Sequence, residues 1–177
     1  MRCRIAGTLL AVALAVAAAG CHRGRRAVDE HLMLTLEEAR AWQHRADVHL
    51  ADGDRDAAIA DVEALLRIAF PSGAAEGEEA RLDAWARLAT LHLAAGPADE
   101  ARALADVERG RGEATRDSFF RAHLETVAGE IEEARARRLD ASDRDGARAA
   151  RQRALELYAR SIAINKRVQA ALAKESP

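Results

Sequence analysis

The chain has 177 residues, with 27 Lys and Arg against 29 Asp and Glu, 49% hydrophobic residues and 3% aromatic residues. This length allows one domain with its own core. The balanced charge and the few aromatic rings argue against a dedicated nucleic-acid-binding protein, which needs a basic face and stacking platforms. The abundance of Ala, Leu, Arg and Glu predicts an all-α fold.

The first twenty residues have the order of a secretory signal. Arg2 and Arg4 form a short basic region, an apolar run covers residues 5–20, and Cys21 follows. The run is mostly Ala and about 16 residues long, whereas a spanning helix needs roughly 20 strongly apolar residues. We therefore expect residues 1–20 to be a signal peptide rather than a permanent membrane span.

The end of this segment, Ala18-Ala19-Gly20-Cys21, resembles a bacterial lipobox, with Ala18 in place of the usual Leu. The resemblance implies cleavage after Gly20 and a lipid on the Cys21 sulfur, which would anchor the chain to a membrane. The alternative is an ordinary signal peptide whose cleavage site happens to precede a Cys. With Cys3 removed and Cys21 lipidated, neither a disulfide nor a cysteine metal site is expected.

Residues 21–34 are expected to be a linker beside the lipid. His22 stands where enteric-type lipoproteins retained at the inner membrane have Asp, so the resemblance favours the periplasmic face of the outer membrane. Arg23, Arg25 and Arg26 add positive charge that an anionic leaflet would attract. The alternative is a solvated linker whose charges are incidental.

Helical patterns then fill a domain over residues 35–176. Thr35 and Glu38 have the spacing of a capping box, which predicts a helix from Thr35 to about residue 52, ended by Gly53. A second helix is expected over 56–69 before Pro71, followed by a loop over 71–79.

The rest of the domain continues in helices with short breaks. Helices are expected over 79–95, ended by Gly96-Pro97, and over 98–109, ended by Gly110-Arg111-Gly112. Asp117-Ser118 has the composition of a helix cap, so a fifth helix should start there. A turn over 140–145 and a last helix over 146–173 complete the chain.

Two of these helical pairs repeat each other. Ala41-Trp42 recurs 43 residues later as Ala84-Trp85, and the same offset relates Gly53 to Gly96. It also relates three more residue pairs: Ala46 and Ala89, His49 and His92, and Leu50 and Leu93. After each glycine, Ala58 is matched with Ala101. Self-similarity of this kind predicts stacked helical hairpins rather than one bundle.

The repeated pattern resembles the tetratricopeptide repeat. Residues 39–71 supply a bulky Trp42, small Ala46 and Ala58, and Gly53 at the positions of that motif, and residues 82–111 supply a similar set. His49 and His92 replace its aromatic residue, and Arg45 replaces its usual Leu. A third hairpin is degenerate. The resemblance implies about three stacked antiparallel hairpins with a long C-terminal helix.

In that family the first helix of each hairpin lines a concave groove that binds peptides. The resemblance places eight residues of this chain in the groove: Arg40, Gln43, Asp47, Leu50, Asp83, Ala86, Thr90 and Leu93. They lack the Lys, Asn and Arg set that clamps a partner's C-terminal carboxylate, so that specific role is not supported. The alternative is that they are ordinary half-exposed helix residues.

No catalytic or metal-binding motif stands out. His44 and His49 are five residues apart and lie on different faces of a helix, and the equivalent positions of His49 and His92 indicate packing. The acidic clusters at 130–133 and 143–145 fit a solvated surface. We therefore expect no enzyme, cofactor or metal site.

The sequence thus predicts a lipid-anchored scaffold that binds another envelope protein through its groove, and no nucleic acid. One alternative is a structural homo-oligomer joined through the last helix, whose apolar residues spread from Tyr158 to Leu172. Another is an accessory subunit of an envelope assembly or secretion machine.

Overall fold

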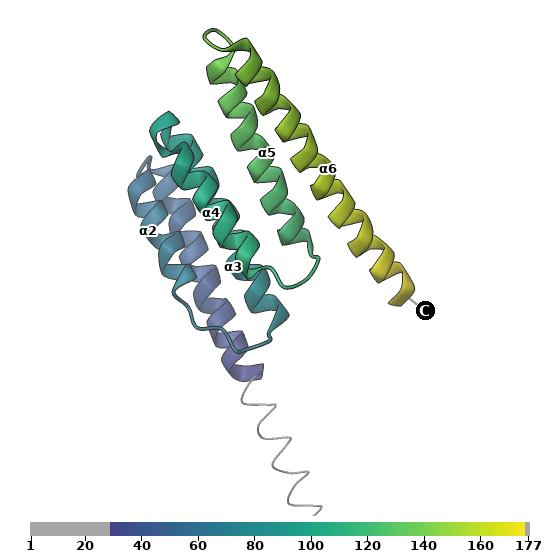
Figure 1. Cartoon of the computed structure of the whole chain (residues 1–177). Coiled ribbons are helices and arrows are strands. Elements are labelled where there is room, and N and C mark those ends of the chain that lie inside the picture. Colours follow the sequence, from purple (N-terminus) through teal and green to yellow (C-terminus); the bar gives the residue numbers. More distant parts are fainter. Residues whose placement is uncertain (1–28, 176–177) are drawn as a thin grey trace, which may run out of the picture.

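The structure is a computed structural model that describes residues 29–175, and within this range the chain is all helical with no strand (Figure 1). The predicted all-α fold and long C-terminal helix are confirmed. The signal peptide, Cys21 and the linker up to residue 28 lie outside the described residues. The elements are a first helix over 29–51, α2 Arg55–Leu66, α3 Ala75–Ala95, the 3-10 helix η1 Pro97–Asp99, α4 Glu100–Glu113, α5 Phe119–Leu139 and α6 Arg144–Glu175.

The first helix corrects the predicted start at Thr35. Residues 29–34 are already helical, so the predicted linker does not extend to residue 34. Thr35 is buried inside the helix, and its hydroxyl donates to the carbonyls of His31 and Leu32 at 3.0 and 2.9 Å. A Thr can bond back to the preceding turn as readily as it can cap the next one, and here the back-bond is formed.

The predicted glycine stops are confirmed at two places. Gly53 and Gly96 have φ of 80° and 123°, a region that favours glycine, and each ends a helix. Asp54 then caps α2 by accepting a hydrogen bond from the Ala57 amide, and Ser118 caps α5 by accepting one from the Arg121 amide, as the sequence predicted. α3 begins at Ala75, four residues before the predicted start.

The predicted stop at Gly110 is wrong, because α4 continues to Glu113. A Cβ on Gly110 would lie 2.9 Å from the methyl groups of Leu124 and 3.0 Å from the Cβ of Trp85. Gly110 is therefore a contact glycine that lets α4 approach α3 and α5 closely, rather than a helix terminator.

The helices stack in sequence order, as Figure 1 shows. α3 packs against α2, α4 and α5, and α5 packs against α6. One apolar cluster joins the first helix, α2 and α3, another joins α3, α4, α5 and α6, and Trp85 borders both. No helix within residues 29–175 is long and apolar enough to cross a membrane.

Packing also corrects one match of the repeat. Ala58 of α2 is fully buried, whereas Ala101 is exposed and Ala103 takes the buried place in α4. The second helices therefore repeat with an offset of 45 residues, and the first helices with 43. The second pair therefore has a longer connection between its two helices than the first pair, and this connection contains η1 after Gly96.

Candidate functional site

The predicted groove residues of the first helix and α3 meet in a polar seam. The Gln43 side-chain amide donates to Asp83 Oδ2 at 2.9 Å, and the Arg87 guanidinium donates to Asp47 Oδ1 at 2.6 Å. Arg87 also donates to the backbone carbonyl of Gln43 at 3.4 Å. Of the predicted residues, Gln43 and Asp83 thus bind each other across the two helices, and Asp47 binds Arg87 of α3.

Arg87 is the residue of this seam that the sequence missed. The Arg87 side chain is only 20% exposed, against 62% for the Asp47 side chain. The guanidinium is therefore the more buried partner of the pair. No motif signals this pair, because it depends on how two helices cross. An exposed pair of this kind contributes about 0–1 kcal/mol to the free energy of unfolding. It therefore adds little to the stability of the contact between the two helices.

The other predicted groove residues are placed differently. Ala86 is fully buried in the core between α3 and α5, so it cannot line a binding surface, and this prediction is corrected. Leu93 packs partly against the same core. Arg40 and Thr90 are exposed and Leu50 is 37% exposed. Arg40 pairs with Glu37 on its own helix.

In both helical pairs a His lies near a buried carboxylate, at different distances and through different ring nitrogens. His49 Nε2 lies 3.6 Å from Asp61 Oδ2, and His92 Nδ1 lies 2.6 Å from Asp106 Oδ2. Both histidines are half-buried, as their equivalent positions predicted, while both carboxylates are buried. The His92–Asp106 hydrogen bond ties α3 to α4, whereas the buried Asp61 Oδ2 has no hydrogen-bond partner among the described residues.

Sequence reasoning missed the aspartates, although a signal was present. Residues 58–62 read Ala-Ile-Ala-Asp-Val and residues 103–107 read Ala-Leu-Ala-Asp-Val, so the motif recurs at the offset of 45. Burial raises the pKa of Asp106, and the hydrogen bond to His92 offsets part of that rise. Residues 29–175 hold no group of three or more His, Cys, Asp or Glu placed to bind a metal ion.

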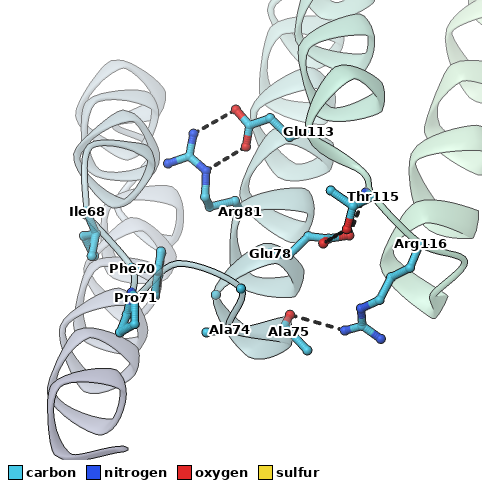
Figure 2. A pocket seen from close by; sticks show the side chains of 12 residues that line it. Ile68, Phe70, Pro71, Ala74, Ala75, Glu78, Arg81, Glu113, Thr115 and Arg116 are labelled. Carbon is cyan, nitrogen blue, oxygen red and sulfur yellow. Dashed lines mark hydrogen bonds and ion pairs between the residues drawn. The ribbon is translucent and has the colours of Figure 1, made fainter. Parts of the chain in front are cut away.

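A cavity of about 610 Å³ lies where the α2–α3 loop faces the α4–α5 connection (Figure 2). Arg81 donates to Glu113 through Nε and Nη2 at 2.6 and 2.8 Å, and to the Leu66 carbonyl at 2.6 Å. Trp85 Nε1 donates to the same Glu113 at 3.0 Å. This network ties the C-terminal ends of α2 and α4 to α3.

Hydrogen bonds also join the residues at the rim of this cavity. Thr115 binds Glu78 through its backbone amide at 3.0 Å, and Arg116 donates to the Ala75 carbonyl at 3.3 Å (Figure 2). These contacts bind the polar groups around the cavity to one another and join the ends of α2, α3 and α4. No protein-family model, curated protein or solved structure matches this chain.

Proposed function

We propose that the protein is a membrane-anchored adaptor of the bacterial cell envelope. In this proposal a tetratricopeptide-like stack of about three hairpins holds a segment of another envelope protein against the first helices of its hairpins. The observation that carries the proposal is the polar seam of Gln43, Asp47, Asp83 and Arg87, because it joins the first helix and α3 side by side.

The chemistry of this face suits an extended or helical peptide. The seam offers hydrogen-bond donors and acceptors, with the Arg40 and Thr90 side chains exposed on the same two helices and Leu50 available as an apolar contact. Peptide-binding surfaces combine such polar contacts with a few apolar anchors. The internal pairs keep these groups in place, which lowers the entropy lost when a peptide binds.

The anchor supplies the second part of the proposal. A lipid on Cys21, outside the described residues, would hold the stack at the periplasmic face of the outer membrane. Confinement to a surface raises the effective concentration of the groove against neighbouring envelope proteins. The proposed role requires neither cofactor nor catalysis, since binding alone is sufficient for an adaptor.

The test places a photo-crosslinking residue at position 90 of the full chain in cells, with a C-terminal tag for capture. We expect one envelope protein to be attached at position 90, and not when the crosslinker replaces Arg102 on α4. Arg40→Glu should reduce the product. Arg102→Glu is the matched control, because both arginines are exposed and pair with an acidic residue three positions earlier. Equal products from positions 90 and 102 would exclude a specific face.

The anchor has its own test. Cells are fed an alkyne-tagged palmitate, and the full chain is isolated from the membrane fraction. Cys21→Ser should abolish both the label and the membrane association, whereas Cys3→Ser should change neither, because Cys3 lies in the segment that would be removed. Label that persists in Cys21→Ser would contradict lipidation at Cys21.

A further inference from the structure

α6 has one buried stripe and one exposed stripe. The buried stripe packs against α5 with spacings of three and four residues, as expected for two long helices in contact. It contains Ala147, Ala150, Ala154, Leu157, Ser161 and Ile164. The exposed stripe carries Leu155 and Ile162, seven residues apart and 63% and 55% exposed. Solitary exposed apolar residues are ordinary, but Leu155 also lines a groove between α5 and α6.

The groove lies between α5 and α6 and has a volume of about 320 Å³. Ala136 and Ala154 line it together with Leu155 and Tyr158, and Glu133, Arg137 and Arg151 also border it. Its lining is mainly apolar with a charged rim, which is the anatomy of a helix-binding groove.

The helical pairs that precede α5 and α6 show which element packs against a pair in this stack. α5 packs against both α3 and α4, and α3 packs against α2 and, through the polar seam, against the first helix. Each pair thus receives the first helix of the next pair. Among residues 29–175, no later helix covers α5 and α6 in this way (Figure 1). Within the described residues, the groove between α5 and α6 is therefore uncovered.

The opposite end of the stack carries a matching stripe. On the first helix, Leu34 and Val48 are 64% and 60% exposed, and the exposed Ala41 lies midway between them, seven residues from each. This is the spacing of Leu155 and Ile162. Repeat proteins need polar caps at their ends to remain apart, and neither end of this stack is polar throughout.

The two ends also differ in charge. α6 contains eight Lys and Arg against three Asp and Glu, whereas residues 29–51 contain two Arg against five Asp and Glu. Five of the eight α6 cations pair with carboxylates of the same chain, and the charge that α6 retains is opposite in sign to the net charge of residues 29–51. The charge therefore favours a head-to-tail contact over a symmetric one.

We propose that the groove between α5 and α6 binds the first helix of a second copy of this chain, so that copies continue one another's stack. The first helix, α3 and α5 run in the same direction in Figure 1, so a helix added in the same way would keep residue 29 of every copy on one side. Such a contact joins two different surfaces and generates rings or filaments. It does not depend on the adaptor role, which uses another face.

The experiment co-expresses two full-length copies with different C-terminal tags, one of which carries a photo-crosslinking residue in place of Ile162. We expect a product that contains both tags, with the attachment in the first helix of the other copy. Val48→Glu in that other copy should lower the yield by about tenfold or more, because it places a charge in the apolar contact. Ala101→Glu, at an exposed position of α4, is the matched control and should leave the yield unchanged.

Each other outcome overturns the proposal. Attachment to α6 of the second copy would indicate a symmetric dimer, attachment to a different protein would assign the groove to that partner, and no product with both tags would show that copies do not meet there. Circular dichroism of Val48→Glu separates a lost contact from a lost fold. Since Val48 is exposed within one copy, the Val48→Glu variant should keep the helical signal of the unmodified protein.

Discussion

Asp106 and Glu113 lie seven residues apart on α4, and the helices around them shift their carboxyl pKa values in opposite directions. Burial raises the pKa of Asp106, and its hydrogen bond to His92 only partly offsets the rise. Burial also acts to raise the pKa of Glu113, but the hydrogen bonds from Arg81 and Trp85 outweigh it and the pKa falls. Because the two carboxylates have different hydrogen-bond donors, the free energy of unfolding linked to Asp106 and that linked to Glu113 change in opposite directions with pH.

Glu113→Gln should destabilise the protein at neutral pH. The change removes a two-bond ion pair to Arg81, and hydrogen bonds to charged groups contribute about 1.5–3 kcal/mol each, so we expect a loss of about 1–3 kcal/mol in the free energy of unfolding. Because the folded pKa of Glu113 is lowered, its stabilisation is present above the ordinary value of 4.5 and is lost as the pH falls through the folded pKa.

Urea unfolding of the variant and the unmodified protein, measured from pH 7 to acid, checks this. The deficit of Glu113→Gln should shrink on acidification. Glu108→Gln is the control on the same helix, since Glu108 is 65% exposed and its pair with Arg111 should contribute little. A deficit that stays constant with pH would show that the Glu113 side chain stabilises the protein through packing and not through its negative charge.

Asp106→Asn should show the reverse dependence. A raised folded pKa means that the stability linked to protonation of Asp106 is fully present below the ordinary value of 3.8 and is lost as the pH rises through the folded pKa. The unmodified protein should therefore gain stability relative to Asp106→Asn as the pH falls from neutrality towards 3.8. The same urea series measures this difference, and a difference that moves in the direction seen for Glu113 would refute it.

Local signals in the sequence predicted the helix boundaries that depend on local geometry. Gly53 and Gly96 end helices because a positive φ is a property of the residue itself. Gly110 looks the same in sequence, yet it lies inside α4 because its missing Cβ makes room for Leu124. A glycine that serves a contact between helices cannot be told from one that serves a turn without knowing the neighbours.

Like the helix boundaries, the candidate site could be predicted only in part from the sequence. The resemblance to the tetratricopeptide repeat placed Gln43, Asp47 and Asp83 on one surface, and in the structure Gln43 binds Asp83 while Asp47 binds Arg87. The resemblance could not show that Ala86 is buried in the core or that Arg87 crosses to Asp47, because both depend on the distance and angle between helices. Small residues in particular can be either exposed or at the closest approach of two helices.

Gly129→Ala should destabilise the protein, although alanine is the better helix former. A Cβ on Gly129 would lie 2.5 Å from a ring carbon of Tyr158, so the ring must move. Overpacking of this kind costs about 1–3 kcal/mol against a propensity gain of about 1 kcal/mol, and we expect a net loss of up to about 2 kcal/mol. Thermal and urea unfolding measure it.

Two further variants define the cause of that loss. Gly112→Ala, where an added Cβ meets nothing within 4 Å, should be neutral or stabilising by up to about 1 kcal/mol. In a Tyr158→Leu background, Gly129→Ala should no longer destabilise, because the ring that it would strike is gone. If the loss persists there, α5 and α6 are kept close by something other than the Tyr158 ring.

Tyr158 should titrate with a pKa of about 12 in the folded protein. Burial beside α5 raises the pKa from 10.0, and the neighbouring Glu133 carboxylate raises it further, since both oppose the phenolate charge. The chain has a single tyrosine, so the phenolate absorbance in an alkaline titration reports this residue alone. In urea the midpoint should return towards 10.0.

The sign of the effect on stability follows from the same shift. A raised folded pKa means that Tyr158 contributes fully below pH 10.0 and that this contribution is lost as the pH rises towards about 12. Glu133→Gln should lower the folded pKa without returning it to 10.0, because burial remains, and Glu108→Gln on α4 should leave it unchanged. A folded midpoint near 10.0 would mean that water reaches the hydroxyl freely, and that the groove between α5 and α6 is wider than the structure shows.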